Sequence, residues 1–148
     1  MTRRAGVITR AEPELGAPAG GAKLGLTGGL AVQELGWDED VDEALRDQLM
    51  DQIEADFVYE AVEAVDVVLL WWRDEDGDLV DGLMDALKDL SPTGHLWLLT
   101  PKVGRAGFVD PADLADGSIG AGLSLTGSAQ VSREWQAHKL VRPKTGRK

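Results

Sequence analysis

The stretch DVVLLWWRDEDGD, residues 66–78, decides the fold of this chain. Its apolar residues run without interruption from Val67 to Trp72, and an acidic turn follows them. A strand with one face in water would alternate apolar and polar side chains, which this stretch does not. We therefore predict a central strand in a sheet that helices cover on both faces. Trp71 and Trp72 should point to opposite faces of that sheet, because side chains alternate along a strand.

The residues after this strand extend it to a strand–helix–strand unit. Residues 74–78 provide a loop and a helix cap, and Pro92 with Gly94 is expected to end the helix. HLWLLT, residues 95–100, reads as a second strand covered on both faces. Such a unit is expected to be right-handed with parallel strands. The helix is indicated by an apolar stripe: Leu79, Val80, Leu83, Met84, Leu87 and Leu90.

Upstream, LAVQEL (30–35) reads as a strand and the segment after it as a helix. Apolar residues recur every four positions from Val41 to Ile53, and Asp38 or Asp40 can cap the helix start. The opposite face, Arg46 included, is expected to lie in water. Residues 56–65 fit either a helical turn or a linker.

Downstream, residues 110–117 predict a short helix with Asp110 as its cap and Pro111 at its first position. Two strands, 123–132 and 135–143, should close the chain as an antiparallel pair. The fold class is thus α/β: a small Rossmann-like sheet of about five strands, mostly parallel, with an antiparallel C-terminal pair. We expect a disordered tail over 1–22, one domain over 23–142 and a basic tail over 143–148.

Charge is distributed unevenly along the chain. The net charge is −11, but residues 24–138 carry six basic and 24 acidic side chains, a net of −18. Such a body repels phosphate backbones, so nucleic acid is not the expected partner. Basic side chains gather at both ends, where they either contact an anionic partner or are solvated: Arg3, Arg4, Arg10, Lys139, Arg142, Lys144, Arg147 and Lys148.

Composition excludes several classes of site. The chain has no cysteine, hence no disulfide, thiolate nucleophile or cysteine-type zinc site. No apolar run approaches the roughly 20 residues that a membrane helix needs, and residues 1–21 do not resemble a secretory signal. We expect a cytoplasmic protein that does not insert into a membrane.

The order of elements, with DVVLL (66–70) and SPTGHLWLLTP (91–101), resembles the C-terminal half of class I S-adenosylmethionine-dependent methyltransferases. Asp66 and Gly94 hold the matching positions. A closer resemblance, over most of the chain, is to a bacterial family known as domain of unknown function 3052. VQELGWDEDVD (32–42) and VVLLWWRDEDGDLVD (67–81) are typical of its high-GC Gram-positive branch. The resemblance implies a methyltransferase-like fold but does not indicate a particular activity. The residues that carry it are Lys23, Leu24, Gly25, Gly29, residues 66–70, Gly94, Leu96, Trp97, Pro101, Lys102, Trp135 and Arg142.

The loop after the first strand departs from the methyltransferase pattern. Glu34, Leu35 and Gly36 begin like its cofactor loop, but Trp37 and acids follow where the pattern needs further glycines. We therefore predict no cofactor, and S-adenosylmethionine is not expected to bind. The sequence leaves open whether Trp37 fills the ancestral pocket or lines it.

Three cations are predicted at one rim of the sheet. Arg73, Lys102 and Arg105 follow the ends of two neighbouring strands, where ligands bind in open α/β sheets. They could hold an anionic ligand or a partner's carboxylates, or pair locally with Asp74, Asp76 or Asp110.

Metal and catalytic signals are weak. Asp74, Asp76 and Asp78 fit the start of a calcium-loop pattern, with Asp85 at its twelfth place, but its glycine and flanking helices are missing. They are more simply helix-capping and solvated acids. His95 and His138 have no sequence partners for a triad, and no G-x-S-x-G motif is present.

The leading hypothesis is therefore a non-enzymatic binding or regulatory module on a degenerate Rossmann-like scaffold, with an unknown protein as partner. Trp37 is the tryptophan expected to be partly exposed and to serve as a contact. The alternative is a ligand-binding enzyme of divergent methyltransferase type that uses the rim of Arg73 and Lys102. A third hypothesis, a nucleic-acid regulator acting through its basic ends, is disfavoured by the acidic body.

Overall fold

The computed structural model describes residues 17–143, which form one mixed five-stranded sheet in the order β1-β2-β3-β5-β4. β1, β2 and β3 run parallel, and β5 pairs antiparallel with both β3 and β4. This confirms the predicted α/β class and the antiparallel C-terminal pair. The strands are β1 (Val32–Leu35), β2 (Val65–Trp71), β3 (Leu90–Pro101), β4 (Ser124–Gln130) and β5 (Trp135–Val141). The helices are η1 (Ala17–Leu24), α2 (Glu43–Ile53), η2 (Asp74–Asp76), α3 (Leu79–Ala86) and α4 (Pro111–Gly120).

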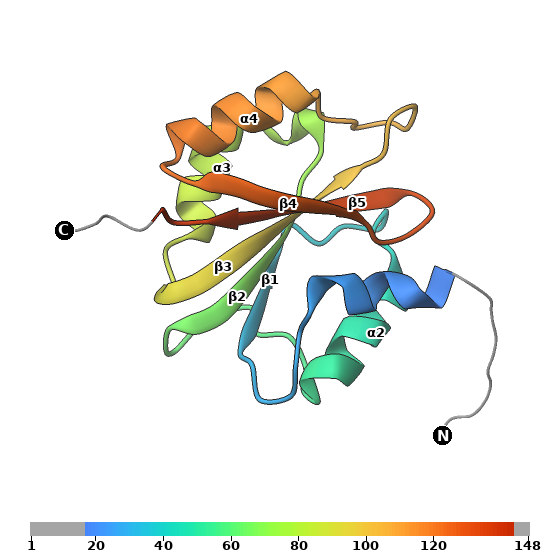
Figure 1. Cartoon of the computed structure of the whole chain (residues 1–148), viewed down its shortest axis with the longest axis vertical. Coiled ribbons are helices and arrows are strands. Elements are labelled where there is room, and N and C mark those ends of the chain that lie inside the picture. Colours follow the sequence, from blue (N-terminus) through green and yellow to red (C-terminus); the bar gives the residue numbers. More distant parts are fainter. Residues whose placement is uncertain (1–16, 144–148) are drawn as a thin grey trace.

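Helices cover the two faces of the sheet in two layers (Figure 1). η1 and α2 pack on one face, and α3 and α4 pack on the other. A hydrophobic core lies on each face of the sheet, and β2 contributes side chains to both. Leu69 and Trp71 are buried on the α2 side, and Val68 and Leu70 are buried on the α3 side. Trp72 packs on the α3 side, opposite Trp71, as predicted. The unbroken apolar run thus reflects burial on both faces.

The start of α2 differs from the prediction. Asp42 is the cap, and its carboxylate accepts a hydrogen bond of 3.0 Å from the backbone N–H of Leu45. Asp38 and Asp40 lie before the helix and do not cap it. Arg46, predicted to be solvated, has only 14% of its side-chain surface exposed and pairs with Glu34 of β1. The four-residue spacing located the helix correctly but did not reveal this polar contact.

The end of α3 was also predicted wrongly. The helix stops at Ala86, and Pro92 and Gly94 lie inside β3. This part of β3 tolerates proline because it precedes the pairing with β5, which starts at His95, and because the β2–β3 register shifts there. Met84, assigned to the apolar stripe, is exposed.

Residues 56–65 form neither of the predicted structures in full. Val58 makes an isolated parallel bridge with Gln33, with backbone hydrogen bonds to Val32 and Glu34. The segment therefore covers the outer edge of β1, which would otherwise be open.

Regular structure starts at Ala17, earlier than the predicted domain start at Lys23. The rest of the predicted N-terminal tail, 1–16, and residues 144–148 lie outside the described residues. The proposed domain boundaries stay predictions.

Candidate functional site

The guanidinium of Arg73 closes the carboxyl ends of β1 and β2. The side chain is almost fully buried. Its Nε donates to Asp40 Oδ2 (3.0 Å), and its Nη2 bonds to the other oxygen of Asp40. Its Nη1 donates to the carbonyl of Gly36 (2.7 Å) and lies 3.4 Å from Asp76 Oδ2. Trp135 packs its ring against the cation, with Cζ 5.4 Å from the ring centroid. The hydrogen bonds of Arg73 are thus directed to the protein itself.

This cluster shifts the ionisation of its members toward the charged forms. The hydrogen bond from Arg73 lowers the pKa of Asp40 below its ordinary value. Burial alone would lower the pKa of Arg73, but the hydrogen bond and charge of Asp40 outweigh burial and raise it. Asp40 and Arg73 therefore form a charged pair across the physiological pH range.

Gly36 allows the turn after β1 to pack directly on the end of β2. Its φ of +78° is in the left-handed region. A Cβ added to Gly36 would lie 2.3 Å from the carbonyl oxygen of Trp71. The turn therefore requires glycine both for its conformation and for space.

A second polar cluster surrounds Glu34, which was predicted to lie at the end of a strand and was not identified as a candidate site residue. The Glu34 side chain is fully buried. It accepts hydrogen bonds from Arg46 Nε (2.7 Å) and Nη2 (2.8 Å), from Tyr59 Oη (3.0 Å) and from Trp71 Nε1 (2.9 Å). Each oxygen of this buried carboxylate therefore accepts two hydrogen bonds, which compensate for its removal from water. A charged side chain inside a predicted strand was the signal that could have found it.

Trp37 and Tyr59 project from this cluster into solvent. Trp37 is 49% exposed and Tyr59 is 55% exposed. Trp37 Nε1 donates to Glu43 (3.1 Å), Arg46 donates to Glu43 (2.6 Å), and Arg46 also donates to Tyr59 Oη (2.9 Å). The hydrogen bonds from Arg46 and then Trp37 lower the pKa of Glu43. We call Trp37, Glu43, Arg46 and Tyr59 together the Trp37–Tyr59 surface. Trp37 was correctly predicted to be partly exposed.

The predicted rim of three cations is divided among separate contacts. Arg73 pairs with Asp40 and Asp76, and Arg105 pairs with Glu134 at 3.2 Å. Lys102 has no ion pair among residues 17–143 and lines a separate cavity. Whether an external anion reaches any of the three stays a prediction.

That cavity, the Lys102 cavity, has a volume of about 350 Å³ and lies beside β4 and β5. Its lining combines one cation, uncharged polar side chains and apolar side chains. The lining residues are Lys102, Val103, Phe108, Val109, Pro111, Leu114, Ser128, Gln130, Gln136 and His138.

His138 is held between two hydroxyl groups in the wall of this cavity. Its Nδ1 lies 2.9 Å from Ser128 Oγ, and its Nε2 lies 3.2 Å from Thr100 Oγ1. Burial lowers the pKa of His138, so the ring is neutral at pH 7. Burial, and then the charge of Lys139, lowers the pKa of His95, which lies in β3. The group of Ser128, His138 and Thr100 depends on the register of three strands, which no sequence motif reveals.

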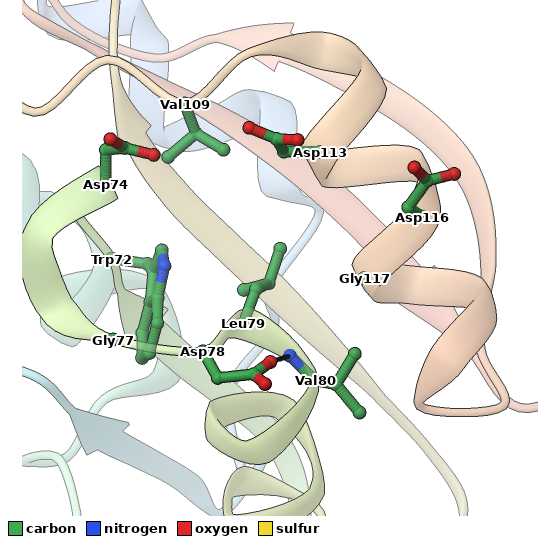
Figure 2. A pocket seen from close by; sticks show the side chains of 10 residues that line it. All are labelled: Trp72, Asp74, Gly77, Asp78, Leu79, Val80, Val109, Asp113, Asp116 and Gly117. Atoms are coloured by element: carbon green, nitrogen blue, oxygen red, sulfur yellow. Dashed lines mark hydrogen bonds between the residues drawn. The ribbon is translucent and has the colours of Figure 1, made fainter.

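A second cavity, of about 290 Å³, is acidic and lies between α3 and α4 (Figure 2). The carboxylates of Asp74 and Asp113 point toward one another across Val109, and Trp72 forms a wall (Figure 2). Asp78 caps α3 by accepting from Val80 N (2.9 Å). The residues that line this acidic cavity are Trp72, Asp74, Gly77, Asp78, Leu79, Val80, Val109, Asp113, Asp116 and Gly117.

The three aspartates of the calcium-loop pattern have different surroundings. Asp76 accepts from the backbone of Arg73 (3.0 Å), Asp78 caps α3, and Asp74 faces the acidic cavity. Within 17–143, no group of three or more acidic or histidine side chains has an arrangement that could hold a metal ion.

Comparison with known proteins gives one family and one fold. The model of the family described as "Protein of unknown function (DUF3052)" matches residues 21–144. Uncharacterised proteins of Mycobacterium tuberculosis and Mycobacterium bovis are 45% identical over 124 residues, covering 83% of this chain and 78% of theirs.

Solved structures with a similar fold are methyltransferases. A SAM-dependent methyltransferase from Thiobacillus denitrificans, in complex with S-adenosyl-L-homocysteine, has a TM-score of 0.55 at 13% identity, covering 86% of this chain and 91% of that one. An O-methyltransferase from neocarzinostatin biosynthesis, NcsB1, has a TM-score of 0.57 at 12% identity over 76% of this chain. This chain spans about half of NcsB1, 49%. These likenesses establish a methyltransferase-like fold.

The helices are short relative to the thickness of a bilayer. Among residues 17–143, no helix has the length and apolar character needed to cross a membrane.

Proposed function

The chain belongs to the family described as "Protein of unknown function (DUF3052)", and we propose that it is a non-enzymatic, regulatory protein-binding module on a methyltransferase-like scaffold. The observation that carries this proposal is the closed end of β1 and β2. Ligands of open α/β sheets bind outside the carboxyl ends of the strands. Here the buried guanidinium of Arg73, bonded to Asp40 and to the Gly36 carbonyl, occupies that place.

The loop after β1 also fits S-adenosylmethionine poorly. Gly36 is followed by Trp37 and by acids, so the loop lacks the further glycines that let backbone approach a cofactor. Arg73 and Trp135 would have to move before a ligand could reach the Gly36 backbone. Such a movement would break the hydrogen bonds and ion pair of a buried charge, which is costly where that charge stays buried without a partner. We therefore propose that the protein works without this cofactor.

The Trp37–Tyr59 surface is the proposed contact with the partner. Trp, Tyr and Arg are the residue types that dominate protein interfaces, and all three occur in this surface. Hydrogen bonds to Glu43 hold Trp37 and Arg46 in position, which lowers the entropic cost of binding. Exposed acids lie close to Trp37 and Tyr59 in the sequence: Asp38, Glu39, Glu60 and Glu63. We therefore propose a protein partner with a basic surface and an apolar recess for Trp37.

Crosslinking in the native cell tests this contact. We expect Trp37→Ala to remove a crosslinked partner that the unchanged protein captures, because a half-exposed interface tryptophan can contribute 2 kcal/mol or more, roughly 30-fold in affinity. Met84→Ala is the matched control, since Met84 is also an exposed apolar side chain but lies on α3. A partner captured equally by the wild type and both variants would contradict the proposed surface.

The competing hypothesis is a ligand-binding enzyme of divergent methyltransferase type. The likeness to solved methyltransferases favours it. It requires the closed end of β1 and β2 to open for S-adenosylmethionine, so direct cofactor binding separates the two hypotheses.

A further inference from the structure

We propose that the Lys102 cavity binds a small carboxylate that has an apolar body. The proposal concerns a different part of the molecule from the Trp37–Tyr59 surface, and it does not depend on the proposed function. The cavity volume of about 350 Å³ is within the range of small-molecule sites, about 300–1,000 Å³.

The charge of the lining favours an anion. Residues 24–138 carry a net charge of −18, yet no carboxylate lines this cavity, whereas four line the acidic cavity between α3 and α4. Lys102 supplies the single positive charge of the lining, and among residues 17–143 it has no ion-pair partner. The Lys102 ammonium can therefore bind a ligand that carries one negative charge, because no acid of the lining competes for it.

The uncharged polar groups of the lining add hydrogen-bond donors. The side-chain amide of Gln136 accepts from Gln130 Nε2 at 3.3 Å, which leaves its own N–H groups available to a ligand. His138 is neutral and bonds to both Thr100 and Ser128. When Thr100 donates to Nε2, Nδ1–H donates to Ser128, and the hydroxyl proton of Ser128 is then available to the cavity. Ammonium, amide and hydroxyl donors together match the oxygens of a carboxylate.

The remaining wall gives the ligand its apolar part. Phe108 and Val109 come from the loop after β3, and Pro111 and Leu114 come from α4, whereas the polar residues Ser128 and His138 come from β4 and β5. A ligand that places its carboxylate at Lys102 can lay an aromatic or branched body against these side chains. A simple inorganic anion would leave this wall unused.

Titration with phenylacetate and phenylacetamide, followed by ¹H–¹⁵N NMR of the full chain, tests the proposal. The two probes have the same ring and nearly the same shape, but only phenylacetate is charged. We expect phenylacetate at millimolar concentration to shift the amide signals of Lys102, Ser128 and Gln136. Phenylacetamide should bind at least about tenfold more weakly, the size of one charge-assisted hydrogen bond.

Two variants complete the test. Lys102→Met should weaken phenylacetate about tenfold and leave phenylacetamide unchanged. Lys88→Met, which removes an exposed lysine that does not line this cavity, should leave both probes unchanged. The spectra report directly whether each variant is folded. Three results would overturn the proposal. They are no shifted signals at about 10 mM phenylacetate, equal affinity for phenylacetate and phenylacetamide, or the same loss of phenylacetate affinity in Lys102→Met and Lys88→Met.

Discussion

Replacing Arg46 with methionine should destabilise the protein strongly at pH 7. The substitution keeps much of the apolar stem but removes both bonds to Glu34, of 2.7 and 2.8 Å. The Glu34 side chain has no exposed surface, so its charge would stay buried with only Tyr59 and Trp71 as donors. Breaking a buried ion pair on one side costs about 3–5 kcal/mol. At about 2–4 °C per kcal/mol for a chain of this size, the melting temperature should fall by roughly 6–20 °C.

A second substitution identifies the buried charge as the cause of that loss. In Arg46→Met, the carboxylate of Glu34 stays buried without its cation. Glu34→Gln replaces this carboxylate with an uncharged amide of nearly the same shape. The double variant Glu34→Gln with Arg46→Met should therefore recover part of the stability that Arg46→Met loses.

Urea denaturation at pH 7 measures these free energies. Arg105→Met is the matched control, because its pair with Glu134 is about half exposed at both ends and should contribute at most about 1 kcal/mol. Two results would refute the role of the buried charge: Arg46→Met costing no more than Arg105→Met, or Glu34→Gln recovering none of the stability that Arg46→Met loses.

Two further predictions concern the closed end of β1 and β2. The pKa of Asp40 is lowered below its ordinary 3.8 by Arg73, so this pair stabilises the folded state at neutral pH and the contribution is lost as the pH falls through the lowered value. Asp40→Asn should therefore be less stable than wild type above about pH 5, and the difference should shrink below about pH 4; urea denaturation from pH 2.5 to 6 would contradict this if the difference were constant. Gly36→Ala should cost at least about 1 kcal/mol more than Gly25→Ala. Both glycines have positive φ, but only at Gly36 would the new Cβ meet backbone, so equal melting temperatures would contradict the proposed packing.

The sequence was sufficient for the elements whose side chains are apolar on defined faces. The run from Val67 to Trp72 located β2 and its two covered faces, and Asp110 with Pro111 located the start of α4. The end of α3 was mispredicted, because Pro92 and Gly94 are breakers of a helix but are tolerated where a strand is unpaired on one side. Local residue preference cannot distinguish these two settings.

The candidate sites were less predictable, because they depend on contacts between residues far apart in the chain. Arg73 was correctly identified as a cation at the end of a strand, but its main partner, Asp40, lies across the turn after β1. Glu34 was predicted near the end of a strand and Arg46 on a solvated helix face, and neither assignment indicated that the fold brings the two side chains together. Such pairs are set by register and helix orientation, which the pattern of apolar residues leaves open.

Titration calorimetry with S-adenosylmethionine and with S-adenosyl-L-homocysteine tests the central claim most directly. We expect no binding of either compound at a protein concentration of about 100 μM, and no rise in melting temperature at millimolar ligand. Binding with a dissociation constant near 10 μM would add about 2.7 kcal/mol of stability at 1 mM ligand, and several degrees of melting temperature. That result would mean that the Arg73 side chain moves away from the carboxyl ends of β1 and β2 to admit the ligand. It would contradict the non-enzymatic proposal and favour a divergent methyltransferase.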